Sequence, residues 1–198
     1  MSFLSTQMSN RLANPGLFEA QIKEYFRKSN NVIQQSKTIA DRICTDAKYA
    51  GATDEVELFT GVFDANYCNL DGNYVRPASE HIIIYGIQVY TAVLESKDEF
   101  DNAQVIWNKG FTTNANPLAG GALTQDTGAP YIDVSLTTNG VQYLQEVTGG
   151  DFDSNLATNS KGTLYLNLPV IWSGQTSLSL KFNTGNGADF NAEYAIRA

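Results

Sequence analysis

Hydrophobic and polar positions follow two different periods along the chain. Up to about residue 50, apolar residues recur every three or four positions, which predicts an amphipathic α-helix. From residue 55 onward they alternate with polar residues or form short continuous runs, which predicts β-strands. The pattern therefore divides the chain into a helical N-terminal arm, residues 1–52, and a β-domain, residues 53–198.

The arm contains the signals expected at the start and end of a long helix. Asn14 suits the N-cap, Pro15 the first helical position and Gly51 the C′ position. A single apolar stripe must be covered by the β-domain, by a neighbouring subunit or by a membrane surface. The membrane is the weakest choice, because the polar face mixes acidic with basic residues. The candidate interface residues on this arm are Phe18, Ile22, Tyr25, Phe26, Val32 and Ile39.

The β-domain contains eight strand candidates separated by clusters of Gly, Asn, Asp and Pro, which favour turns. Asn139 and Gly140 predict a type I′ hairpin, because both residues tolerate a positive φ. The run 82–94 is too long for a typical strand, and Gly86 within it predicts a bulge, or a bend from one sheet into another. The candidates span residues 56–63, 82–94, 104–109, 131–137, 141–147, 163–168, 176–183 and 190–197.

Eight strands with no helix among them predict an all-β fold, an eight-stranded jelly-roll sandwich that follows the helical arm. An immunoglobulin-like sandwich is the competing arrangement, although the Cys…Trp…Cys pattern of true immunoglobulin domains is missing. With 198 residues, of which 42% are apolar, the chain is long enough to bury a core. No run approaches the roughly 20 apolar residues of a membrane-spanning helix.

The charge of the chain is unevenly distributed. Residues 1–48 carry seven basic and four acidic residues, whereas the remainder carries six basic and seventeen acidic residues. An acidic β-domain is a poor partner for a phosphate backbone, so only the arm could contact nucleic acid. The first residues lack the features of a secretory signal, and two cysteines do not suggest a disulfide scaffold. We therefore expect folding in a reducing cytosol.

Residues with catalytic or ligand-binding chemistry are few, and we expect no enzyme, no cofactor and no metal centre. His81 is the single histidine, and Cys44 and Cys68 lack the spacing of a zinc cluster. The acidic stretches 69–73 and 151–155 match a calcium loop only in part; turns with side-chain hydrogen bonds are favoured there over calcium. Trp107 and Trp172 either fill the core or an interface, or stack against sugars.

Two stretches resemble the single jelly-roll coat proteins of icosahedral viruses, above all of bacteriophages. Leu168-Pro169, Ile171 and Gly174-Gln175-Thr176 resemble a late hairpin of those capsid proteins, and "HIIIYGIQVYTA" resembles their early core strand. The resemblance implies sheets that form the shell wall and an arm that faces the particle interior. In contrast to the usual basic tail, this arm is predicted to be helical, which puts genome neutralisation in doubt.

The function expected from this resemblance is that of a self-assembling capsid subunit, present in the virion and assembled in the host cytoplasm. Its partners would be copies of itself and other virion proteins, with no strong signal for nucleic acid and a weak one for membrane contact. The alternative is a carbohydrate-binding β-sandwich, lectin-like or from a phage receptor-binding apparatus, with Trp172 as its stacking residue. A hydrolase that uses scattered carboxylates has no positive support.

Overall fold

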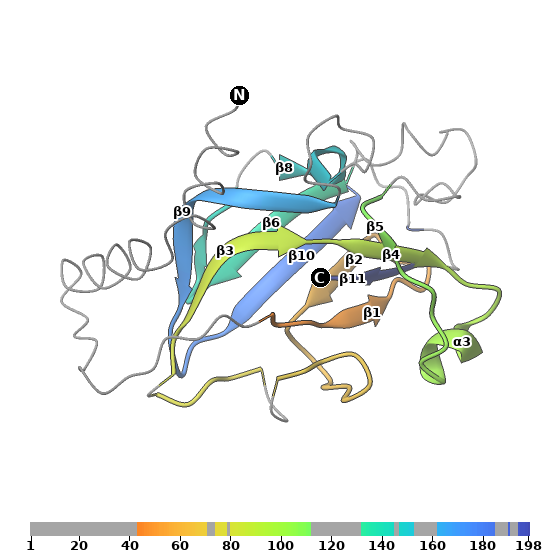
Figure 1. The fold of residues 1–198 in the computed structure, drawn as a ribbon, viewed down its shortest axis with the longest axis horizontal. Helices are drawn as coiled ribbons and strands as arrows, with labels where there is room; N and C mark the ends of the chain where they lie inside the picture. The colour runs from red at the N-terminus through yellow and green to blue at the C-terminus, as the bar shows by residue number, and fades with distance from the viewer. Residues whose placement is uncertain are drawn as a thin grey trace, which may run out of the picture. The chain divides into compact units, whose positions relative to one another are not determined.

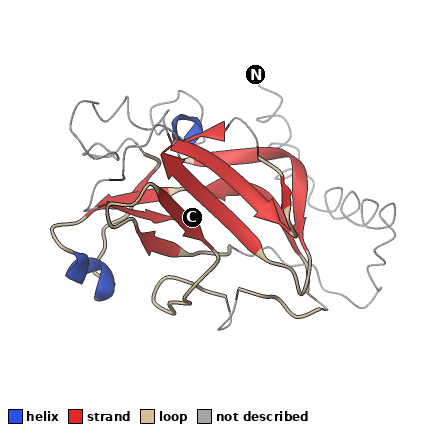
Figure 2. Cartoon of the chain, turned by 180° about the vertical axis from the view of Figure 1, so that it is seen from behind, coloured by secondary structure: helices blue, strands red, loops and turns tan. Residues whose placement is uncertain are grey.

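The computed structural model describes residues 43–70, 74–78, 80–111, 132–144, 147–152, 162–184, 190 and 194–198. The segment Cys44–Ala198 forms one compact unit. This unit consists mostly of antiparallel β-strands, which confirms the all-β prediction (Figures 1 and 2). The predicted N-terminal helix lies outside the described residues over nearly all its length.

The strands form three groups. Sheet A has the order β1-β11-β4-β5, sheet B has the order β2-β10-β6-β7 with β8 also on β6, and sheet C contains β3 and β9. The strands are β1 (Ala47–Tyr49), β2 (Glu55–Leu58), β3 (Ile82–Gln88), β4 (Tyr90–Val93), β5 (Asn108–Lys109), β6 (Ile132–Thr138), β7 (Val141–Gln142), β8 (Val147–Thr148), β9 (Thr163–Trp172), β10 (Leu178–Thr184) and β11 (Tyr194–Arg197).

The strand pairing is nested along the chain. The first strand pairs with the last, β1 with β11, and the second pairs with the second to last, β2 with β10. Further inward, β3 pairs with β9, and β6 pairs with β7 at the centre of the nest. Successive nested pairs lie in different sheets. These four pairs follow the order of one long folded hairpin, and the pairs β4–β11 and β6–β10 connect them within sheets A and B.

The predicted long strand does pass from one sheet into another. β3 lies in sheet C and β4 in sheet A, with Val89 between them, as Figure 1 shows. The register of β3 against β9 shifts between Ile84 and Gly86, as expected of a bulge at a glycine. The Val89 N–H donates to the Gly162 carbonyl at 2.7 Å, and its own carbonyl accepts the Gly110 N–H at 2.9 Å. The backbone at the crossing is thus hydrogen-bonded on both sides.

The predicted late hairpin is wrong, because its two strands belong to different sheets. β9 continues through Pro169 to Trp172 and pairs with β3, whereas the next strand, β10, pairs with β2 and β6. Pro169 is accommodated because the register shift in this part of β9 requires no ladder hydrogen bond from it. The Asn139–Gly140 hairpin is confirmed, with φ of 51° and 73° at its two turn residues.

Other expected boundaries differ from the structure. Residues 47–49 form strand β1 instead of the last turn of the predicted helix, because backbone pairing with β11 holds them extended. The expected strand 104–109 is reduced to β5 and preceded by a short helix, α3 (Lys97–Asp101), where no helix was predicted. The expected strand 141–147 is divided into β7 and β8, and a 3-10 helix, η2 (Gly149–Phe152), follows.

One apolar core fills the space between the sheets. Sheet B presents alternate residues to it, so that Leu178, Leu180 and Phe182 of β10 are buried while the residues between them are not. Tyr194 and Ile196 of β11 contribute from sheet A to the same cluster. A second, smaller cluster lies apart from this core and contains Tyr67, Phe100 and three alanines.

Candidate functional site

The predicted interface residues of the arm lie outside the described residues. Phe18, Ile22, Tyr25, Phe26, Val32 and Ile39 are all in this group. The surfaces that the structure does describe are the outer faces of the two larger sheets and the loops beside them. We therefore describe these faces first and then the polar group that positions the loops.

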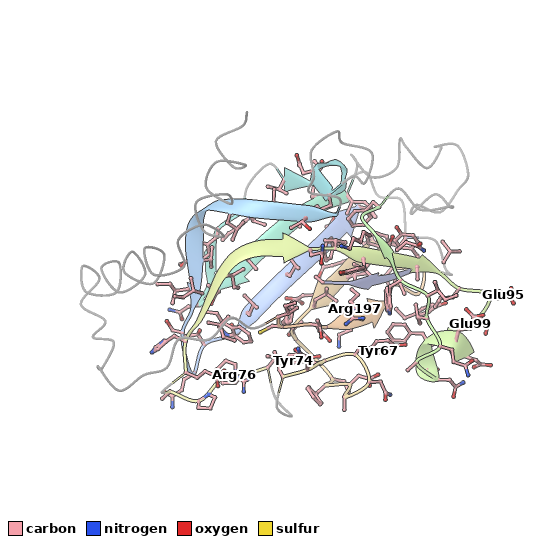
Figure 3. The ribbon with its side chains drawn as sticks, viewed as in Figure 1. Tyr67, Tyr74, Arg76, Glu95, Glu99 and Arg197 are labelled. Carbon is pink, nitrogen blue, oxygen red and sulfur yellow. The ribbon has the colours of Figure 1, made fainter. Side chains whose placement is uncertain are left out.

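An aromatic group covers the outer face of sheet A; we call it the aromatic cap and define it as Tyr49, Tyr67, Phe100 and Trp107. Tyr67 stacks on Phe100 with ring centroids 4.2 Å apart, and Trp107 meets Tyr67 edge-on at 6.1 Å. The Tyr67 hydroxyl donates to the Phe100 carbonyl at 2.5 Å, which joins the loop after β2 to α3 (Figure 3).

Small residues on three neighbouring strands allow the aromatic cap to approach the sheet. Ala195 of β11 pairs with Ala92 of β4 on one side and with Tyr49 of β1 on the other. Ala47, Ala92 and Ala195 are all buried in the cluster that contains Tyr67 and Phe100. Because alanine side chains are short, the aromatic rings can lie close to the strand backbones there.

The outer face of sheet B carries polar side chains only, among the residues described for β2, β6 and β10. We call this row the polar ladder and define it as Glu55, Glu57, Asp133, Ser135, Thr137, Ser179, Lys181 and Asn183. The Lys181 ammonium lies 3.0 Å from a Glu55 carboxylate oxygen, and the Ser179 hydroxyl donates to Glu57 at 2.5 Å. The bond to Glu55 raises the pKa of Lys181.

Asp46 is a fully buried carboxylate at the end of the compact unit where β1 begins. It accepts the Phe59 backbone N–H on Oδ2 at 2.7 Å and the Tyr74 hydroxyl on Oδ1 at 3.1 Å. Its backbone also exchanges two 3.0 Å hydrogen bonds with Ala198. Burial raises the pKa of Asp46, and the bond from the Phe59 N–H and the charge of Lys48 oppose that rise. Burial and the Asp46 charge raise the pKa of Tyr74.

The hydrogen bond that Asp46 accepts from the Phe59 N–H fixes a strained segment of the backbone. Phe59 has a φ of 63°, in the left-handed region that bulky residues rarely adopt. The Lys48 ammonium donates to the Val62 carbonyl at 2.8 Å and lies 5.6 Å from the centre of the Tyr74 ring. Asp46 and Lys48 therefore hold the loop that leads from β2 to Tyr67.

Two apolar side chains project into solvent from the segments beside the aromatic cap. Val62 is 85% exposed and Ile106 is 83% exposed. Ile106 stands between Val105 and Trp107, which both pack into the smaller cluster. We did not identify either residue from the sequence; the available signal for Ile106 was its place in a run of three consecutive apolar residues at 105–107.

The structure contradicts one sequence hypothesis and places several others. Trp172 is fully buried, and its indole N–H donates to the Thr176 carbonyl at 2.9 Å, so its ring cannot stack on a sugar. Trp107 is half-buried within the aromatic cap, and His81 is exposed just before β3. The carbohydrate-binding alternative thereby loses its principal residue.

The two partial calcium loops are described only in part. The Asp151 carboxylate accepts the Thr148 N–H at 2.8 Å, a local side-chain bond, whereas Asn69 accepts the N–H of the distant Thr45 at 2.9 Å. In the described part of the chain, no three His, Cys, Asp or Glu side chains are grouped so that they could hold a metal ion. Over the same residues, no helix is both long and apolar enough to span a membrane.

The fold and these surfaces define an all-β protein built from antiparallel sheets. No protein-family model, no curated protein and no solved structure matches the chain.

Proposed function

We propose that the chain folds as a single jelly roll and serves as a shell-forming capsid subunit of a virus, with a bacteriophage as the first candidate. The nested strand pairing carries this proposal. A jelly roll contains eight strands in two sheets, arranged as two Greek keys. The pairs β1–β11, β2–β10, β3–β9 and β6–β7 supply eight such strands; β4 then continues β3 as one bent strand, and β5 and β8 are additional strands of two residues each. Successive pairs lie in different sheets, which supports this topology over an immunoglobulin-like one.

The proposed subunit would act through its surfaces, with copies of itself as the main partners and other virion proteins as further ones. Within the described residues, β1, β2 and β9 each hydrogen-bond to a single strand, so each has one edge open to a neighbour. Val62 and Ile106 add exposed apolar contacts beside the aromatic cap. We propose that the arm contributes a further contact through its apolar stripe, on the inner side of the shell.

The first test is the native mass of the purified full-length chain, by light scattering with negative-stain imaging of the same sample. The proposal expects closed particles, pentamers or hexamers. A monomer that does not assemble across a range of salt and protein concentrations would overturn it.

A second test asks whether the exposed apolar residue at position 106 contributes to assembly. Ile106→Asp should reduce the assembled fraction at least tenfold, while its thermal unfolding stays close to that of the wild type, because a side chain this exposed adds little to folding. Asn108→Asp, an exposed polar position two residues away, is the matched charge control. Equal assembly of both variants would remove Ile106 from the interface.

The arm is tested in the same way with Ile22→Asp, and Gln21→Asp is its control. Ile22 belongs to the apolar stripe, whereas Gln21 does not. The proposal expects a lower particle yield for Ile22→Asp but not for Gln21→Asp. The β-strand signal of the compact unit in circular dichroism should be unchanged in both variants. A normal yield from Ile22→Asp would exclude the stripe as an assembly contact.

A further inference from the structure

The two cysteines of the chain lie in neighbouring segments of the compact unit. Cys44 is half-buried at the start of the unit, and Cys68 is buried in the loop between β2 and β3. Both are thiols, and no disulfide joins them. They are separated in sequence, but the segments that carry them are neighbours in the compact unit.

Hydrogen bonds of the residue after Cys44 hold these segments together. The Thr45 N–H donates to the Asn69 side-chain oxygen at 2.9 Å, and the Thr45 hydroxyl donates to the Tyr67 carbonyl at 3.2 Å. Thr45 is therefore bonded to the residues on either side of Cys68. Since Cys44 directly precedes Thr45, the backbones that carry the two thiols lie side by side.

The two cysteine side chains also contact the same apolar cluster. Cys68 belongs to the main core cluster, and Cys44 packs against that cluster. Tyr67, the residue before Cys68, instead faces the smaller cluster on the outer side of sheet A. The charge of the Cys44 thiolate is close enough to Cys68 to contribute to the raised pKa of the Cys68 thiol.

We propose that Cys44 and Cys68 form a redox-sensitive pair that closes into an intramolecular disulfide by exchange with a small-molecule disulfide. The Cys44 thiolate attacks one sulfur of glutathione disulfide, which forms a mixed disulfide and releases one glutathione thiolate. The Cys68 thiolate then attacks the Cys44 sulfur, forms the protein disulfide and releases the second glutathione. Two protein thiols are oxidised and one glutathione disulfide is reduced to two thiols, so electrons and protons balance.

The environment of Cys68 determines which of the two exchange steps, mixed-disulfide formation or ring closure, is slow. Burial raises the pKa of the Cys68 thiol; the bond from the Leu70 N–H opposes the rise, and the charges of Asp46 and Cys44 add to it. Lys48, on the neighbouring β1, acts in the opposite direction, and Tyr74 is the other titratable group nearby. Because the thiolate is the nucleophile, ring closure should accelerate about tenfold per pH unit as long as the pH stays below the pKa of Cys68.

The disulfide would link the first residue of the compact unit Cys44–Ala198 to the loop that carries Tyr67. Residues 1–43 of the N-terminal arm directly precede this first residue in sequence. Oxidation would close a loop between residues 44 and 68 and restrict the unfolded chain. The expected increase in Tm is about 5–15 °C for a unit of this size.

The test uses the reduced full-length chain incubated with glutathione disulfide at neutral and at alkaline pH, followed by intact mass and peptide mapping. At neutral pH, glutathione attached to Cys44 should accumulate. At alkaline pH, a peptide pair linked through Cys44 and Cys68 should replace it, and the Tm should rise.

Cys44→Ala and Cys68→Ala are the matched variants, and they also separate chemistry from folding. Cys68→Ala should keep the mixed disulfide on Cys44 at all pH values, whereas Cys44→Ala should react slowly or not at all. If Cys68→Ala fails to fold, the wild-type peptide map alone decides. Independent glutathionylation of both thiols, or disulfide-linked dimers in place of the internal link, would overturn the proposal.

Discussion

The outer faces of sheets A and B lie on opposite sides of one shared core but differ in how they meet solvent. On sheet A, Ala92 and Ala195 lie beneath the aromatic cap, which is anchored by the stack of Tyr67 on Phe100. On sheet B, the polar ladder has no such cover among the described residues, and its side chains bond to each other. A sheet face is therefore protected either by small residues under a cap or by polar residues in contact with solvent.

This difference predicts where the stability of the unit is concentrated. Aromatic rings bury large apolar areas, whereas exposed ion pairs contribute little. Substitutions in the aromatic cap should therefore be costly, and substitutions in the polar ladder should be tolerated. The predictions below test this ranking, from the largest expected effect to the smallest.

Tyr67→Ala should lower the free energy of unfolding by about 3–4 kcal/mol, because it removes a buried ring between Phe100 and Trp107. Tyr67→Phe is the control: it keeps the ring and removes only the 2.5 Å bond to the Phe100 carbonyl, at a cost of about 1 kcal/mol. Urea unfolding followed by circular dichroism measures both. Equal losses for the two variants would show that the hydroxyl, and not the stacking, holds the aromatic cap.

Asp46→Ala should lower the free energy of unfolding by about 2–3 kcal/mol, because the Phe59 N–H and the Tyr74 hydroxyl lose their buried acceptor. Asp46→Asn should cost less, since the amide oxygen still accepts one of these bonds. The same urea titration applies. If Asp46→Ala proved neutral, the carboxylate would not be what fixes the loop on which the aromatic cap depends.

The pH dependence of the wild type against Asp46→Asn gives a further test of this group. Burial raises the pKa of Asp46 above its ordinary value of 3.8, so the folded state binds the proton more tightly than the unfolded state. The stabilising contribution is complete below 3.8 and is lost as the pH rises through the folded-state pKa. The wild type should therefore lose stability relative to Asp46→Asn as the pH rises from 3.8 through the folded-state pKa. The opposite trend would mean that the hydrogen bonds to the carboxylate outweigh its burial.

Gly140→Ala should destabilise the β6–β7 hairpin by about 1 kcal/mol, because Gly140 has a φ of 73° that L-residues adopt only with strain. Among the described residues, and apart from the two chain neighbours of Gly140, no heavy atom lies within 4 Å of the position that a Cβ would take, so the cost belongs to the backbone. Asn139→Gly, at the neighbouring turn position, should change stability by less than about 0.5 kcal/mol. A much larger loss in Gly140→Ala would indicate that the turn is packed against something the described residues do not include.

Lys181→Ala should lower the free energy of unfolding by less than about 1 kcal/mol, and this loss should shrink at high salt. Lys181 and Glu55 are each more than a third exposed, so solvent screens the 3.0 Å pair. Denaturation at low and high ionic strength checks both statements. A loss as large as that of Tyr67→Ala would contradict the proposed contrast between the two faces.

The sequence predicted the alternating part of the fold well. The regular alternation of Leu178, Leu180 and Phe182 with polar residues identified β10, and Asn139–Gly140 identified the hairpin turn between β6 and β7. Gly86 correctly marked the irregularity in the pairing of β3 with β9. These features depend on local spacing, which a sequence shows directly.

The features that the sequence did not reveal depend on partners far along the chain. β1 is a strand because residues 195–197 pair with it, whereas its own composition fits a helix equally well. The pairing of β9 with β3 instead of with β10 likewise depends on contacts between residues that are distant in sequence. The aromatic cap unites Tyr67, Phe100 and Trp107 from separate segments, and no local spacing indicates that they meet.

The nested pairing also governs when this protein can fold. Ala47 cannot pair with Arg197 until the ribosome has synthesised the roughly 150 residues that separate them. At about 5–20 residues per second, this synthesis takes roughly 8–30 s. The β6–β7 hairpin can close as soon as it emerges, so structure should grow outward from the middle of the chain. Such a high contact order favours slow, post-translational completion and leaves early strands exposed to aggregation or chaperones meanwhile. The earliest strand of the β-unit to be synthesised is therefore among the last to find its partner.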